Sequence, residues 1–167
     1  MIKSITKAFT VINHYDLNSI SSINVPFAVS DEKICCCWPC TSEPIVAKFS
    51  ISKSGYVSGE SIFFNSIIEN NTKRKIKPLK VKLVQNLKFY TKENSQEDTK
   101  TIAEIQYTKN IESKTKDEWN DFLLVPSLCP TSSGLCKIID ISYMLVLTFV
   151  PTGFAFSTKL QIPIVIG

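Results

Sequence analysis

The sequence predicts an all-β protein, a sandwich of two sheets packed face to face. Apolar and polar residues alternate with period two from one end of the 167-residue chain to the other, and no segment has the i, i+3, i+4, i+7 apolar spacing of an amphipathic helix. Turn-forming residues separate the alternating segments. This length fits one hydrophobic core. We therefore expect a single domain over residues 1–167, with about eight strands.

The N-terminal half contributes three predicted strands. An apparent strand covers residues 8–17. Residues 45–52 place apolar side chains at odd positions and mainly lysine or serine at even ones, which is typical of a half-buried strand. Gly55 and Gly59 mark the turns that follow. Residues 61–69 then form a second, more buried strand.

The C-terminal half contributes four more. Residues 81–90 carry leucine, valine and phenylalanine on one face and lysine and asparagine on the other. Residues 101–111 and 138–150 alternate in the same way, and a final strand is expected at residues 154–165. The Pro-Thr-Gly sequence at 151–153 supplies the turn between the last two strands.

Two longer connections, residues 31–44 and 126–136, are rich in Cys, Pro and Ser and are predicted to be irregular. Four of the six cysteines crowd into the first of them: Cys35, Cys36, Cys37 and Cys40. Neighbouring residues on a strand point to opposite faces, so pairing within this cluster is unfavourable. Reduced thiols and a cytosolic location are therefore expected.

The Cys37-Trp-Pro-Cys40 spacing suits a zinc knuckle or a redox pair. A structural zinc site needs four ligands, however, and the remaining Cys129 and Cys136 are separated by six residues. Buried thiols that act as small apolar side chains are the stronger interpretation. Palmitoylation of the cluster, which would tether the domain to a membrane, is a further hypothesis.

The charged residues exclude dedicated reading of nucleic acid. A net charge of +4 comes from 18 lysines and one arginine, Arg74, so bidentate recognition of bases or phosphates has a single candidate. A mild positive excess favours weak attraction to anionic lipid headgroups, so peripheral membrane association is an expectation.

Positive charge concentrates in one stretch. Its residues are Lys73, Arg74, Lys75, Lys77, Lys80 and Lys82. Protection of a sheet edge against aggregation is the stronger interpretation. The alternative is a docking patch for acidic or phosphorylated cargo tails.

Catalytic machinery is not evident. The one histidine, His14, stands in the apparent strand 8–17 without a visible partner, and there is neither a phosphate-binding glycine loop nor a His-Glu-x-x-His motif. We therefore predict no catalytic, cofactor or metal site and no enzyme activity. The longest apolar run, residues 143–150, is far below the ~20 residues that span a bilayer.

Several segments together resemble the C-terminal domain of the alpha-arrestins, the arrestin-domain-containing proteins. They are Lys7-Ala-Phe-Thr-Val-Ile, Tyr15-Asp-Leu-Asn18, the Cys35–Ser42 cluster, Gly55-Tyr-Val-Ser-Gly-Glu60, Ile68-Glu-Asn70, Trp119, Tyr143-x-Leu and Leu160-x-Ile-Pro-Ile-Val-Ile-Gly167. They occur in this order across nearly the whole chain.

The resemblance implies an immunoglobulin-like β-sandwich with arrestin topology. It also implies an adaptor that binds cytoplasmic regions of membrane proteins and links them to endocytic sorting and ubiquitin ligases, at the plasma membrane or endosomes. Family members recruit HECT-type ligases through Pro-Pro-x-Tyr motifs in a tail, and they carry an N-terminal arrestin sandwich. Neither is found in residues 1–167.

Two alternatives remain. An extracellular immunoglobulin-like adhesion module is favoured by the even number of cysteines and by the sequon Asn70-Asn-Thr72. An enzyme that uses a cysteine with His14 is the weaker one, because nothing places a third group beside them.

Overall fold

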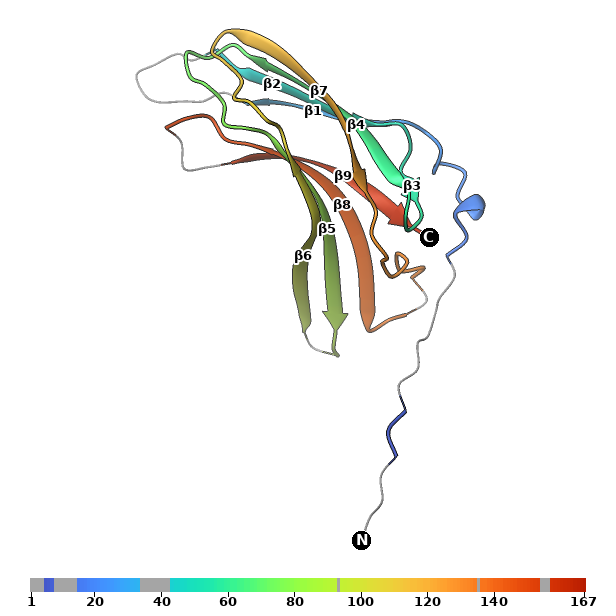
Figure 1. Ribbon diagram of the computed structural model, residues 1–167. Coiled ribbons are helices and arrows are strands. Elements are labelled where there is room, and N and C mark those ends of the chain that lie inside the picture. Colours follow the sequence, from blue (N-terminus) through green and yellow to red (C-terminus); the bar gives the residue numbers. More distant parts are fainter. Residues whose placement is uncertain (1–4, 8–14, 34–42, 93, 135, 154–156) are drawn as a thin grey trace.

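The protein is a sandwich of two β-sheets (Figure 1). The computed structural model describes residues 5–7, 15–33, 43–92, 94–134, 136–153 and 157–167. Sheet 1 has the strand order β1-β2-β4-β7: Phe27–Lys33, Ile45–Ile51, Ser61–Asn70 and Thr115–Leu124. Sheet 2 has the order β3-β9-β8-β5-β6: Gly55–Tyr56, Thr158–Ile166, Ile139–Phe149, Lys80–Tyr90 and Ser95–Gln106. The prediction of an all-β sandwich is confirmed.

The alternating sequence pattern places one face of each strand in the core. In β2 every odd-numbered residue from Ile45 to Ile51 is buried, and in β9 every even-numbered residue from Thr158 to Ile166 is buried. All strand pairs are antiparallel except β3 with β9. The two buried faces meet between the sheets, where apolar burial stabilises the fold.

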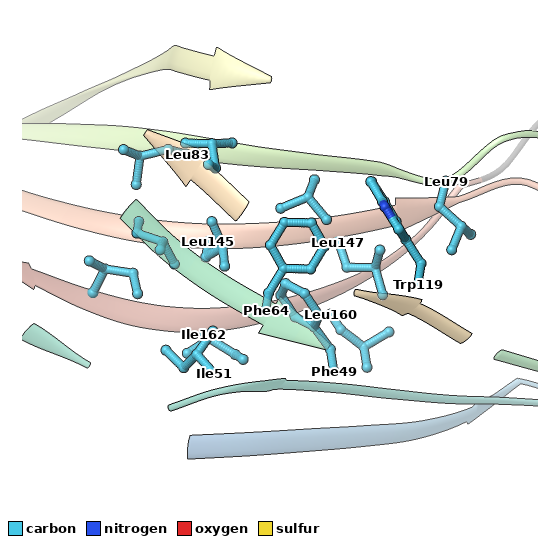
Figure 2. Close-up of a cluster of buried hydrophobic side chains, with 14 of the residues drawn as sticks. Phe49, Ile51, Phe64, Leu79, Leu83, Trp119, Leu145, Leu147, Leu160 and Ile162 are labelled. Carbon is cyan, nitrogen blue, oxygen red and sulfur yellow. The ribbon is translucent and has the colours of Figure 1, made fainter. Parts of the chain in front are cut away.

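Aromatic rings fill the centre of the core (Figure 2). The rings of Phe49 and Phe64 lie 5.9 Å apart, and Trp119 meets Phe64 edge to face at 5.0 Å. Tyr107 stacks on the other side of Trp119 at 5.1 Å. Such offset and edge-to-face contacts add to the energy of area burial. Because Tyr107 follows β6 and Trp119 lies on β7, this stack closes one flank of the sandwich.

Five predicted strands match observed ones with small differences at their ends. The strands expected at 45–52, 61–69, 81–90, 138–150 and 154–165 correspond to β2, β4, β5, β8 and β9. Residues 154–156 lie outside the described residues. The described part of the irregular connection 126–136 contains no strand, as expected.

Other strand predictions are wrong. The strand expected at 101–111 is observed as β6, which begins at Ser95 and ends at Gln106. Its first half was not predicted, because residues 95–101 are exposed on both faces and carry no apolar alternation. Residues 31–33, expected to be irregular, end β1, and β7 was not predicted. Of the strand expected at 8–17, residues 8–14 lie outside the described residues, while Leu17 starts the short 3-10 helix Leu17–Ser19.

A β-bulge divides β6. Leu83 of β5 pairs with Ala103, but its neighbour Val84 pairs with Thr101, so Ile102 is the extra residue. A bulge bends a strand and locally increases its twist. The N-terminal part of β6 lies at the edge of sheet 2 with β5 beside it, and β8 pairs with the other side of β5, so the three strands run together to the lower end in Figure 1.

Candidate partner-binding surface

One end of the sandwich collects four connections, which we call the loop end. The described parts of these connections are residues 43–44, 71–79, 107–114, and 150–153 with 157. They carry six basic residues and two acidic ones: Lys73, Arg74, Lys75, Lys77, Lys109 and Lys114, with Glu43 and Glu112. The excess of four positive charges equals the net charge of the whole chain.

Asn70 fixes the shape of the basic loop. Its side chain is fully buried at the end of β4, and its Nδ2 donates to the carbonyl oxygens of Arg74 at 2.7 Å and Glu112 at 2.8 Å. Its Oδ1 accepts from Thr72 Oγ1 at 2.7 Å and from the Thr72 amide at 3.2 Å. One amide side chain thus joins the 71–79 and 107–114 connections, as buried polar groups need such partners.

Backbone hydrogen bonds join the 71–79 connection to the connections at 107–114 and 150–153. Ile76 exchanges two of them with Ile111, at 2.9 and 3.0 Å. The Lys77 amide donates to the Val150 carbonyl at 2.9 Å, and the Thr152 amide donates to the Lys75 carbonyl at 2.8 Å. The basic side chains therefore project from a fixed backbone, which lowers the entropy that a partner must remove on binding.

The six predicted docking residues form one strip with two parts, which we call the basic strip. Lys73, Arg74, Lys75 and Lys77 are exposed on the 71–79 connection. Lys80 and Lys82 lie on β5, and their side chains point to the outer face of sheet 2. The strip runs from the loop end onto this outer face.

Three of the six basic residues in the strip already form ion pairs with carboxylates. Lys75 Nζ lies 3.0 Å from Glu112, while Lys80 and Lys82 lie 3.1 and 2.8 Å from the two oxygens of Glu104. Hydrogen bonds from Lys82 and then Lys80 hold the pKa of Glu104 below its ordinary value. Among the described residues, no carboxylate forms an ion pair with Lys73 or Lys77. These two cations are the ones most open to an incoming anion.

The strip continues into a polar groove on the outer face of sheet 2. The groove has a volume of about 600 Å³ and includes Lys80, Lys82, Thr148, Lys159 and Gln161. Lys80 pairs with Thr148, and Thr148 with Lys159, so these side chains form one row across three strands. Sequence reasoning missed Lys159 and Thr148, although their outward positions follow from the alternation of β8 and β9.

A second surface lies on the outer face of sheet 1. Phe63 and Phe122 are 62% and 49% exposed, with ring centroids 5.7 Å apart, and Leu124 is 57% exposed beside them. We call these three residues the aromatic shelf. A groove of about 650 Å³ runs from Phe63 and Phe122 to Pro26. Sequence reasoning did not single out this surface, because isolated exposed aromatics in a strand carry no motif.

The residues that sequence analysis considered for chemistry are only partly described by the structure. The described residues contain no group of three or more His, Cys, Asp or Glu side chains that could hold a metal ion. His14 and the Cys35, Cys36, Cys37 and Cys40 cluster lie outside the described residues. Cys129 and Cys136 are exposed free thiols. Within the described part of the chain, no helix is long and apolar enough to cross a membrane.

The sequon of the extracellular alternative is poorly placed. A glycan would be attached to Nδ2 of Asn70, and this atom donates two hydrogen bonds inside the loop end. A glycan on a fully buried side chain is incompatible with this packing. The geometry therefore weighs against an extracellular module.

Two packed antiparallel sheets with this strand order define the structural class, an immunoglobulin-like β-sandwich. The profile described as "Arrestin (or S-antigen), C-terminal domain" matches residues 41–167. This chain belongs to that family and is a member of the alpha-arrestins.

Curated relatives agree with this assignment. The chain is 28% identical to mouse arrestin domain-containing protein 4 over 166 residues, which cover 99% of this chain and 39% of the relative. It is 26% identical to human arrestin domain-containing protein 1 over 137 residues, 82% of this chain and 31% of that protein. Arrestin domain-containing protein 17 of Caenorhabditis elegans is 27% identical over 167 residues, which cover 96% of this chain and 38% of that protein. The chain thus spans about two fifths of such relatives or less.

Proposed function

We propose that this domain is a non-catalytic adaptor module that binds acidic cytoplasmic segments of membrane-protein cargo along the basic strip. The supporting observation is the fixed loop end, where Lys73 and Lys77 project without an ion-pair partner among the described residues. An acidic or phosphorylated segment would contact these two lysines first. It would then follow β5 toward Lys80 and Lys82, where it competes with Glu104.

The proposed biological setting is endocytic sorting. The adaptor would act at the plasma membrane or endosomes and link cargo to a HECT-type ubiquitin ligase. Ligase recruitment is assigned to a tail segment that residues 1–167 do not contain, and a partner arrestin sandwich is expected in the same protein. Both assignments rest on family membership.

Charge reversal tests cargo binding. The probe is a fluorescent peptide of alternating glutamate and serine, with one serine phosphorylated. The Lys73→Glu/Lys77→Glu variant is expected to lower the affinity about tenfold, since two exposed attractions become repulsions. Lys48→Glu/Lys116→Glu is the matched control, because it makes the same charge change on the outer face of sheet 1. Equal weakening by both variants, or none by the first, would contradict the proposal.

A second candidate function is peripheral attachment to an anionic membrane. The specific observation is that the loop end holds an excess of four positive charges. Clustered basic residues attract anionic lipid headgroups.

Vesicle sedimentation tests attachment. Binding to phosphatidylcholine vesicles is expected only when phosphatidylserine is included, and Lys73→Glu/Lys77→Glu should abolish it. Equal binding to neutral vesicles would rule out the electrostatic contribution.

A further inference from the structure

The N-terminal half of β6 is an unusual strand. Each of residues 95–101 is exposed, so this half of the strand buries no side chain on either face of the sheet. Among the described residues only β5 pairs with β6, and the outer edge of β6 faces no other strand. On its other side β5 pairs with β8 from Lys80 to Phe89, so β6 is the open edge of a continuous sheet. A further strand would satisfy the open backbone groups along this edge.

The charge along this flank of the sandwich is negative. Strand β6 carries three carboxylates and one lysine, namely Glu97, Asp98 and Glu104 with Lys100. The neighbouring edge strand β7 of sheet 1 repeats this composition with Asp117, Glu118 and Asp121 against Lys116. We call these two strands the acidic flank. It stands out in a chain whose net charge is +4.

The open part of the acidic flank is its β6 side. Near the loop end, Tyr107 OH donates to Asp117 at 3.1 Å and Lys109 lies 3.3 Å from the other oxygen of Asp117. These contacts, with the Tyr107–Trp119 stack, bridge the two strands there. Farther along β6, Glu97 and Asp98 have no ion pair among the described residues. The free run is therefore residues 95–101.

We infer that the acidic flank binds an extended, lysine- or arginine-rich peptide of a partner protein, which adds to sheet 2 as a strand beside β6. Main-chain hydrogen bonds to residues 95–101 supply the alignment. Alternate basic side chains of the peptide reach the carboxylates on the two faces of β6. The site selects the opposite charge to the basic strip, although Glu97 also lines the groove that holds Lys80 and Lys82.

The inference is tested by NMR on the ¹⁵N-labelled chain. The probe is an amidated peptide of alternating lysine and valine, as long as the exposed run. Shifted and newly protected amides are expected along Ser95–Gln106. A peptide of the same charge with proline at its centre should bind much more weakly, because proline cannot continue a strand ladder.

Two variants separate this site from general charge attraction. Glu97→Lys/Asp98→Lys is expected to lower the affinity about tenfold. The matched control is Asp31→Lys/Glu32→Lys, an adjacent pair of exposed carboxylates on the edge strand β1, which should leave the affinity unchanged. The inference would be overturned by equal losses in both variants, by equal binding of the proline peptide, or by amide changes outside β6.

Discussion

Single buried polar atoms mark the places where this core departs from simple apolar packing. Asn70 satisfies its amide completely, with two donated and two accepted hydrogen bonds. Ser66 does not: its hydroxyl is buried between β2 and β7 and finds no hydrogen-bond partner among the described residues. Its cross-strand neighbours are Phe49 and Trp119. A small side chain at this position leaves room for these rings.

Replacing Ser66 by alanine is expected to stabilise the fold. The substitution removes a buried hydroxyl without a partner and keeps the volume small, so the free energy of unfolding should rise by about 1 kcal/mol. Urea denaturation monitored by Trp119 fluorescence measures the change. Ser50→Ala, on the outer face of the adjacent strand, serves as the control and should change the value by less than about 0.5 kcal/mol. Destabilisation by Ser66→Ala would show that the hydroxyl has a partner.

The pKa of Glu104 reports on the lysines of the basic strip. Hydrogen bonds from Lys82 and Lys80 lower this pKa from 4.5. The ion pair therefore stabilises the fold above pH 4.5, and its contribution is lost as the pH falls through the lowered pKa. Lys82→Gln should raise the pKa more than Lys80→Gln, as measured by carbon-detected NMR titration. The reverse order would contradict the geometry.

The residues of the candidate site were only partly predictable. The six basic residues of the strip lie within ten positions of one another, so the sequence alone shows them as a cluster. Their partners Glu104 and Glu112 lie on strand β6 and the loop after it, 22 or more residues away. Lys159 and Thr148 join the groove only through strand pairing. The aromatic shelf likewise depends on the register of β4 with β7. Contacts between distant segments leave no local pattern to read.

At the scale of elements, the strands that sequence reasoning missed or misplaced are edge strands. Strands β1, β6 and β7 bury few side chains, whereas β2, β4, β8 and β9 alternate clearly and were found. A period of two in apolar residues reflects burial on one face of a strand. A segment that is exposed to solvent on both faces, such as the N-terminal half of β6, lacks this period. The bulge at Ile102 further breaks the alternation of β6.

The loop-end elements depend on Asn70. Asn70→Ala is expected to lower the free energy of unfolding by roughly 2–4 kcal/mol, because the substitution removes a buried side chain that makes four hydrogen bonds and leaves the carbonyls of Arg74 and Glu112 without this donor. Amide hydrogen exchange should accelerate in the 71–79 and 107–114 connections. Asn71→Ala is the control, since Asn71 makes one long side-chain contact of 3.4 Å and should be nearly neutral. Similar losses in both variants would refute this role.

At the scale of the whole molecule, the aromatic shelf favours association. Phe63, Phe122 and Leu124 form an exposed apolar surface on the outer face of sheet 1. Weak self-association is expected at high concentration in static light scattering, and Phe63→Ser/Phe122→Ser should reduce it. Ile138→Ser removes another exposed apolar side chain away from the shelf and should have no effect. A monomeric mass for the unmodified chain at all concentrations would contradict this prediction.

The separation of charge in the sandwich has a consequence for how the molecule moves toward its partners. Positive charge gathers at the loop end, and negative charge gathers on β6 and β7. This arrangement gives the domain a permanent electric dipole moment. A nearby anionic surface would exert a torque that turns the loop end toward that surface before any contact forms. At physiological ionic strength this torque acts only over distances of about 8 Å, so the domain would rotate into place during the last step of its approach.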